Sequence, residues 1–397
     1  MPSELVELDD LYIERGGPAY RLMQRVGLIQ GDGPSLRRRI VAFWCLTWVP
    51  LLGLAFWEGV ALHQQPQLSL LCDFAAYARF LIGIPLLFVA EVVIGERVTR
   101  GGRTFIDAGL VGSAEYPAFQ QAVRRLARWR DSLLAEVVLV GIAFVGAWLF
   151  TIESLYGEKV TLWHSALVQT PEGPRYSAVG LYYSLVAVPI VQFFLYRWMW
   201  RYLIWVRFLY DMSRLPLRLV PTHADGAAGL AFLGSVQMSF GILAASVCIV
   251  LSAAAGSLIV FHDVGIETFR VHFITVIAIS ELLFLGPLTL FTPALVRTRL
   301  AWLRHYGQLV LRYNRAFHQK WVDSSTPADE ALLGSGDIQS LADLGNAYGF
   351  IREMRTVPFS FRIMLQLAVV TVLPTLPLLL LVMPVDEVVN LLSRALL

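Results

Sequence analysis

Long uninterrupted runs of apolar residues dominate this chain, and most reach the roughly 20 residues that a helix needs to cross a bilayer. They predict seven transmembrane helices, at residues 40–62, 73–95, 132–152, 178–200, 229–261, 271–294 and 362–384. The last run contains Pro374 and Pro377, and proline inside a helix removes a backbone hydrogen bond and kinks the chain. This segment is therefore either a bent span or a re-entrant hairpin.

The polar segments between these runs also carry helical patterns. Phe119, Val123 and Leu126 recur at steps of three and four residues, with arginines off that stripe, which predicts an amphipathic helix. A second amphipathic pattern at residues 303–321 follows the sixth span almost without a break, so that span is expected to continue beyond the membrane. A further helix is expected from residue 338, with Asp337 as its N-cap.

The composition agrees with these patterns. Of the 397 residues, 56% are hydrophobic and 16% are charged, and the mean hydropathy is +0.61, whereas about 25% of residues in soluble domains are charged. We therefore expect an all-α integral membrane protein of about seven transmembrane helices, extended by amphipathic cytoplasmic helices. The net charge of +2 gives no support for nucleic-acid binding. The expected regions are 1–39 (a cytoplasmic N-terminal segment), 40–296 (the transmembrane bundle with a helical loop at 96–131), 297–361 (a cytoplasmic helical element) and 362–397 (a final span and short tail).

The distribution of arginine predicts which side of the membrane each loop faces. Twenty-seven of the 32 Lys and Arg residues fall in four segments that seven spans would place on one side, and cytoplasmic loops carry such an excess. The N-terminus is therefore expected in the cytoplasm. It is acidic and precedes any apolar run, so it does not resemble a cleavable signal peptide. Almost all the basic residues are arginine, which favours a GC-rich bacterial genome and, with it, the bacterial inner membrane.

Four ionisable residues fall inside the predicted spans, where charge is costly and by default marks a functional candidate. At 1.5 Å per helical residue, Arg79 lies about 9 Å and Glu281 about 15 Å from the outer ends of their spans, so we expect them to form an ion pair. Glu91 and Glu136 lie near the cytoplasmic ends of their spans and are expected to share a wet vestibule with Arg201. These residues either lie on an ion path, fix helix register, or extend towards the interface. Helix breakers follow Glu281 in "FLGPLTLFTP", as in many transport sites.

The segment "PTHADGAAGL" at residues 221–230 precedes the fifth span. Asp225 is expected to be the N-cap of that helix, because aspartate accepts the free N–H groups of a first turn. A cap does not explain His223. Together, His223 and Asp225 are therefore also candidates for a cytoplasmic ligand or gating site.

Three functions remain open from the sequence. The first is an ion channel or ion-translocating transporter, built as a homo-oligomer in the lipid bilayer with small ions as its cargo. The second is a membrane-interface enzyme or a lipid- or phosphate-binding protein with its site near His223 and Asp225. The third is a scaffold or sensor that transports nothing. No catalytic, zinc, haem or nucleotide motif is present, so an enzyme is disfavoured, and the sequence assigns no cofactor or metal.

Overall fold

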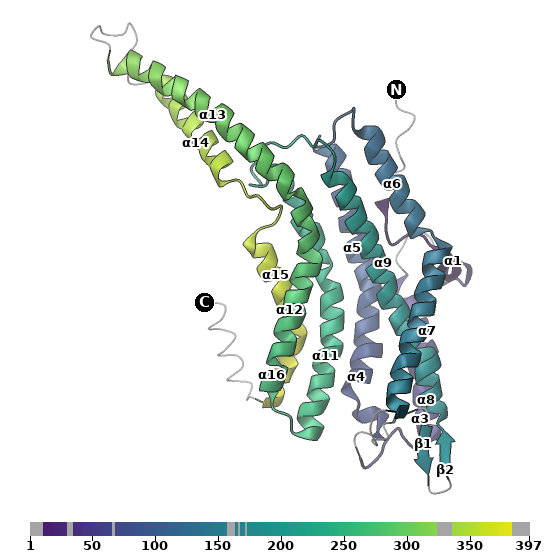
Figure 1. Ribbon diagram of the computed structural model, residues 1–397. Helices are drawn as coiled ribbons and strands as arrows, with labels where there is room; N and C mark the ends of the chain where they lie inside the picture. The colour runs from purple at the N-terminus through teal and green to yellow at the C-terminus, as the bar shows by residue number, and fades with distance from the viewer. Residues whose placement is uncertain are drawn as a thin grey trace.

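The computed structural model of the chain describes residues 11–29, 35–65, 68–156, 163–165, 167–170, 173–323 and 336–382, which form a bundle of long helices (Figure 1). Within these residues, six helices are long and apolar enough to cross a membrane: Leu36–Trp57, Phe74–Asp107, Ala178–Ser213, Phe232–His262, Ile266–Trp321 and Phe361–Leu381. A seventh is added if the pair Tyr116–Arg130 and Leu133–Leu149, bent by 46°, counts as one span. The chain is a multi-pass membrane helical bundle, and the predicted fold class is confirmed.

Most spans are built from two or more helical pieces. The first consists of α2 (Leu36–Leu46) and α3 (Trp48–Trp57), after a short α1 (Pro18–Arg25). The next joins α4 (Phe74–Tyr77), the π-helical turn η4 (Ala78–Gly83) and α5 (Ile84–Asp107), after a 3-10 turn η3 (Leu70–Cys72). The amphipathic helix α6 (Tyr116–Arg130) then precedes α7 (Leu133–Tyr156). The predicted apolar face of α6 is confirmed, because Phe119, Val123 and Leu126 are buried.

The middle of the chain repeats this construction. A small antiparallel hairpin of β1 (Leu167–Thr170) and β2 (Gly173–Tyr176) pairs Leu167 with Tyr176 and was not predicted. It leads into α8 (Ala178–Tyr182), a second π-helical turn η5 (Tyr183–Ala187) and α9 (Val188–Ser213). The next span along the chain consists of α10 (Phe232–Ser239) and α11 (Gly241–His262).

The last third of the chain contains the longest helix. It runs through η6 (Ile266–Phe269), α12 (Arg270–Leu285), the 3-10 turn η7 (Gly286–Phe291) and α13 (Thr292–Trp321). The predicted interruption after Glu281 is therefore a 3-10 turn, and the helix continues beyond it as expected. The antiparallel helix α14 (Gly336–Glu353) returns along α13, and the two form an arm that projects from the bundle (Figure 1). The Asp337 carboxylate ties the arm together by accepting from Lys320 Nζ at 2.7 Å and Trp321 Nε1 at 3.0 Å.

The final span shows how the chain accommodates its two prolines. It consists of α15 (Phe361–Val372), a 3-10 turn η8 (Leu373–Thr375) and α16 (Leu376–Val382). The segment runs the length of α11 and α12 without turning back within the described residues (Figure 1). Of the two alternatives, the structure therefore matches the span and not the re-entrant hairpin. The expected external tail from residue 383 onward lies outside the described residues.

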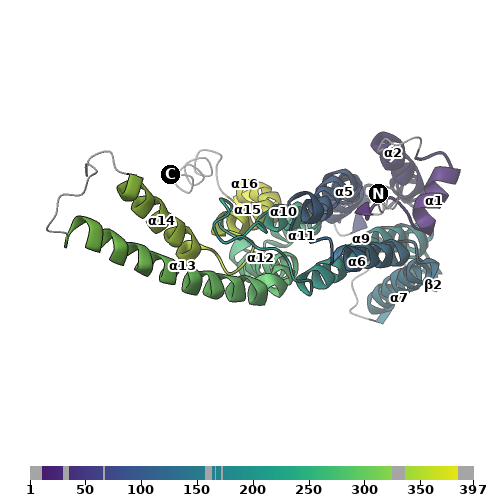
Figure 2. The same cartoon turned by 90° about the horizontal axis from the view of Figure 1, so that it is seen from above.

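The centre of the bundle is the pair α5 and α9 (Figure 2). Helix α9 also packs against α6 and α7, while α11 packs against α5 and connects it to α15. The core between these helices is aromatic and includes Phe80, Phe105, Tyr202, Trp205 and Phe208, all almost fully buried. The arginine-rich segments gather at one end of the bundle, near α6 and the arm, and the β-hairpin lies at the other (Figure 1). We call these the arginine-rich end and the hairpin end.

Candidate functional site

The predicted ion pair between Arg79 and Glu281 is not formed. Arg79, in the π-helical turn of the second span, donates a hydrogen bond to the Tyr183 hydroxyl. Glu281, on α12, has two shielded carboxylate oxygens that accept no hydrogen bond from any residue the structure describes. The depths of the two residues allowed the pair, but helix packing does not: α5 packs against α9 and α11, and α12 packs chiefly against α15.

Glu91 and Glu136 are brought together, as expected from their similar depth in the spans, and Arg201 lies beside Glu91. Arg201 donates to Glu91 at 2.7 Å, and Arg197 lies 3.5 Å from Glu91 and 3.3 Å from Glu136. Arg39 of α2 forms a further ion pair with Glu91. We call these five residues the Glu91 cluster. All five side chains are at most 10% exposed, so the cluster is a packed ionic core and not the open vestibule that was expected.

The local sequence explains how this cluster assembles. Arg197 and Arg201 are four residues apart on α9 and therefore share one face of that helix. That face meets Glu91, which lies in the middle of α5. Glu136 lies in the first turn of α7, where the helix dipole favours a carboxylate. Pairing of this kind makes buried charge tolerable, because an unpaired ion in the same position would lose its hydration without compensation.

A strap formed by residues 11–17 lies across the cluster. Three of its carbonyl oxygens accept from arginine: Tyr12 from Arg130 at 3.0 Å, Glu14 from Arg201 at 2.9 Å, and Gly16 from Arg197 at 3.3 Å. At its far end, Gly17 N–H donates to Asp131 at 2.8 Å, and Ala19 N–H donates to Glu136 at 2.6 Å. The strap is therefore fixed to the same charged side chains that hold the helices together.

Glu14 is the titratable group of the strap. Its side chain is 11% exposed, and its Oε2 atom has no hydrogen-bond partner among the described residues. Burial raises the pKa of Glu14 to about 7, against the opposing effects of its backbone hydrogen bond and of Arg201. The carboxyl group packs against Gly95 of α5, where an added Cβ would overlap it. Glu14 therefore changes charge near neutral pH, directly over the ionic cluster.

A second polar group lies nearer the hairpin end of the same two helices. Arg79 and Tyr183 lie in the two π-helical turns, each six residues before a proline, Pro85 or Pro189. Proline lacks an N–H, so the helix loses an intrahelical hydrogen bond there, and π-helical turns occur frequently at functional sites. In η4, two backbone carbonyls accept hydrogen bonds from neighbouring helices instead. The Phe80 carbonyl accepts from Trp44 at 3.1 Å, and the Gly83 carbonyl accepts from Ser246 at 2.9 Å.

Aromatic contacts extend from Tyr183 towards the hairpin end. His164 stacks on Tyr183 with ring centroids 5.0 Å apart, and Trp163 meets Tyr183 edge to face at 5.1 Å. Trp163 Nε1 donates to Asp73 at 3.0 Å, and Asp73 also caps the first turn of α4 through Ala76 N–H. Burial lowers the pKa of His164 to about 4, so its imidazole is neutral at neutral pH.

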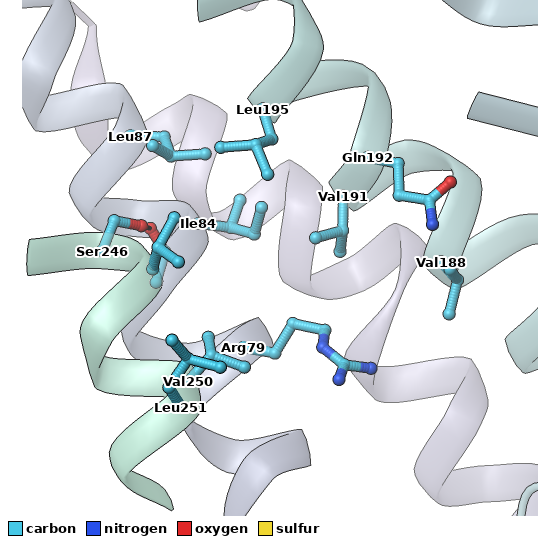
Figure 3. Close-up of a pocket in the computed structure, with 12 residues that line it drawn as sticks. Arg79, Ile84, Leu87, Val188, Val191, Gln192, Leu195, Ser246, Val250 and Leu251 are labelled. Carbon is cyan, nitrogen blue, oxygen red and sulfur yellow. Dashed lines mark hydrogen bonds between the residues drawn. The ribbon is translucent and has the colours of Figure 1, made fainter. Parts of the chain in front are cut away.

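A pocket of about 300 Å³ lies between α5, α9 and α11. Figure 3 shows its lining, with Arg79, Gln192 and Ser246 as polar residues among aliphatic side chains. Just beyond the pocket, Trp198 Nε1 donates to the Leu87 carbonyl at 2.9 Å, and the Arg201 guanidinium lies 5.2 Å from the Trp198 ring. Trp198 therefore lies between the pocket and the Glu91 cluster.

His223 and Asp225 do lie together, but Asp225 is not the predicted helix cap. The helix begins at Phe232, and the Asp225 carboxylate instead accepts N–H groups from a tight loop, those of Ala227, Gly229 and Ala231 at 2.9–3.1 Å. Burial alone would raise the pKa of Asp225, but these hydrogen bonds outweigh it and the pKa is lowered. His223 Nδ1 lies 3.0 Å from the carboxylate, with its side chain 54% exposed. The carboxylate is thus occupied by its own loop, and the arrangement favours a structural role.

Sequence reasoning missed several members of these groups. Arg39 and Arg197 were counted only as topological anchors, and Glu14 only as part of an acidic N-terminus. A signal existed for the π-helical turns, since Arg79 and Tyr183 precede their prolines by equal distances. No comparable signal exists for the strap, because its contacts depend on which helices are neighbours.

Comparison with known protein families, curated proteins and solved structures finds no match for this chain. Within the described part of the chain, no three His, Cys, Asp or Glu side chains gather closely enough to hold a metal ion.

Proposed function

We propose that this protein transports a small ion or ionic solute across a membrane, along the interface between α5 and α9. The observation that carries the proposal is that two charged groups lie on the same helix pair with a pocket between them. Arg79 lies on one side of this pocket, and the Glu91 cluster lies beyond its other end at Trp198. Ionisable residues are costly within a bilayer and characteristically mark ion and substrate pathways.

The two ends of the pocket are covered by different kinds of contact. Towards the arginine-rich end, Trp198, the Glu91 cluster and the strap form consecutive barriers. Towards the hairpin end, Arg79 and Tyr183 lie in irregular helical turns, and broken helices are typical of sites that bind transported solutes. We propose that the structure corresponds to a state closed at the arginine-rich end, with Trp198 and the cluster as the gate.

The proposed setting is a bacterial inner membrane with the arginine-rich end in the cytoplasm. The arginine bias supports this orientation, because positive loops are retained on the cytoplasmic side. The proposed pathway lies within one chain, so it needs no second subunit to complete it. A homo-oligomer remains compatible with the proposal, with one pathway in each subunit.

Ion flux into proteoliposomes tests this function. Purified protein would be reconstituted, and gradients of several cations and anions would be followed for the native chain and for Arg79→Gln. The expected result is flux in the native protein and at least a tenfold loss in Arg79→Gln. Arg304→Gln is the matched control, since Arg304 lies exposed on the arm. The absence of flux of every ion and solute from folded native protein would refute the proposal.

One further variant distinguishes this pathway from a route along α12. Glu281 has no hydrogen bond to either charged group within the described residues. A path along α5 and α9 predicts that Glu281→Gln keeps native flux and selectivity. If Glu281→Gln abolished flux while Arg79→Gln did not, the pathway would have to be moved to α12.

A further inference from the structure

We infer that the pocket between α5, α9 and α11 binds an amphipathic organic anion, with its acidic head at Arg79 and a short aliphatic chain along the apolar wall. This inference rests on the proposed function and names the class of solute carried. A carboxylate attached to a chain of several carbons is the simplest such molecule.

Arg79 supplies the positive charge for the head group. No carboxylate lies within 4.0 Å of its guanidinium among the residues that the structure describes, and its hydrogen-bond partner is the neutral Tyr183 hydroxyl. The nearby Asp73 carboxylate is engaged by Trp163 and by the Ala76 N–H. A guanidinium has five N–H donors in a planar fork that matches a carboxylate or phosphate. An anion in the pocket would therefore find a charge that the chain itself does not neutralise by a direct ion pair.

Gln192 supplies a second polar contact. It lines the pocket, and its side-chain amide carries two N–H donors from which a carboxylate can accept. In Figure 3 the Gln192 amide and the Arg79 guanidinium lie towards the same side of the pocket. A carboxylate head held at Arg79 would therefore accept a second hydrogen bond from the Gln192 amide nitrogen.

The rest of the lining selects for an apolar body. It consists mainly of aliphatic side chains, namely Ile84, Leu87, Val191, Leu195, Val250 and Leu251. A volume of about 300 Å³ is at the small end of the range for ligand pockets. A bare inorganic anion would leave this wall unfilled, and a hydrocarbon without a charge would leave Arg79 uncompensated. The two halves of the lining together favour a molecule with both parts.

Part of the wall also borders the surroundings of the bundle. Val247 and Leu251 of α11 line the pocket and are 38% and 43% exposed. Exposed aliphatic residues on a membrane helix face hydrocarbon. An anion of this class can therefore come either from solution at the hairpin end or from the bilayer, and both sources share the same acidic head and aliphatic chain.

Ligand binding to the full-length protein in nanodiscs tests the inference. Thermal unfolding would be followed with octanoate, 1-octanol, octylammonium and inorganic phosphate as probes. Octanoate is expected to raise the unfolding temperature in a saturable manner, and the other three probes are expected to bind at least tenfold more weakly. Equal effects of octanoate and octanol, or of octanoate and phosphate, would overturn the inference.

Three variants assign the binding to this pocket. Arg79→Gln is expected to weaken octanoate binding at least tenfold, and Val191→Trp, which fills the cavity, is expected to abolish it. Gln192→Ala provides a milder change if either variant fails to fold, with an expected loss of several-fold. The exposed Arg304→Gln should bind as the native protein does. Unchanged octanoate affinity in the folded pocket variants would place any binding elsewhere and overturn the inference.

The chain length of the probe identifies the source of the ligand. Stronger binding of butanoate or octanoate than of dodecanoate would support a soluble acid, and the reverse order would support one from the bilayer. Octanoate binding without flux of any solute would keep this inference and contradict the proposed function. Flux of inorganic ions without octanoate binding would keep the function and overturn this inference.

Discussion

Protonation of Glu14 should control how firmly the strap over the Glu91 cluster is held. The docked carboxyl has a pKa of about 7 against 4.5 for an exposed glutamate, because burial disfavours its charged form. Between these two values the docked strap holds a proton that a released strap would lose. The stability of docking is therefore greatest below pH 4.5 and falls as the pH rises through 7.

The size of the effect follows from the shift. One pKa unit corresponds to about 1.4 kcal/mol, so the difference between 4.5 and about 7 weakens docking by roughly 3 kcal/mol on going from low to high pH. Solvent screening is small because the side chain is only 11% exposed. This shift raises the population of the released strap by roughly 300-fold over the full pH range, and by about 100-fold between pH 5 and pH 8.

Hydrogen–deuterium exchange of residues 11–17 measures this population, once rates are corrected for the intrinsic pH dependence of exchange. In the native protein, protection of the strap should fall by about 100-fold between pH 5 and pH 8. In Glu14→Gln, which cannot titrate, protection should be the same at both pH values. Glu96→Gln is the control, since Glu96 is exposed on α5 and pairs with Arg100. Native protection that does not change with pH, or a dependence that survives in Glu14→Gln, would refute the reasoning.

Three further substitutions test the contacts around this region. Glu91→Gln should destabilise the folded protein by roughly 3–5 kcal/mol in thermal unfolding, because it leaves buried arginines without their shared counter-ion; a change below 1 kcal/mol would contradict that role. Gly95→Ala should expose the strap to exchange at every pH, since its methyl group overlaps the Glu14 carboxyl, and native protection in this variant would show that the strap packs elsewhere. Asp225→Ala should make its loop sensitive to protease, because it removes the acceptor of three N–H groups. Since the pKa of Asp225 is lowered, the loop of the native protein should loosen only as the pH falls through that lowered pKa. Equal cleavage of the variant and the native protein would contradict this role of Asp225.

The spans could be predicted from sequence because each must be apolar along its own length. Every predicted span corresponds to a helix, although the bounds shift; the run predicted at 271–294, for example, belongs to a helix of 56 residues. The association of Glu91 with Glu136 and Arg201 was also predictable, since all three lie at similar depth. Depth along a helix is a local property and can be read from the chain.

The sequence did not allow us to predict which helices lie next to one another. Arg79 and Glu281 have compatible depths, but depth does not determine which helices are adjacent or which way a side chain faces around its helix. The Asp225 cap failed for a local reason: Gly226, Ala228 and Gly229 all adopt positive φ angles, which keep the chain in a turn and delay the helix to Phe232. Glu14 and Arg39 acquire their roles only when distant segments pack together.

The central claim is that solute passes through the pocket between α5 and α9, and chemical block at Val191 tests it most directly. Cys45, Cys72 and Cys248 would first be replaced by serine, and Val191→Cys would be added in the pocket wall. Flux would be measured before and after treatment with a negatively charged thiol reagent, with Arg304→Cys on the exposed arm as control. We predict that modification of Val191→Cys blocks flux and that modification of Arg304→Cys does not. Full labelling of Val191→Cys with unchanged flux would contradict the proposed pathway.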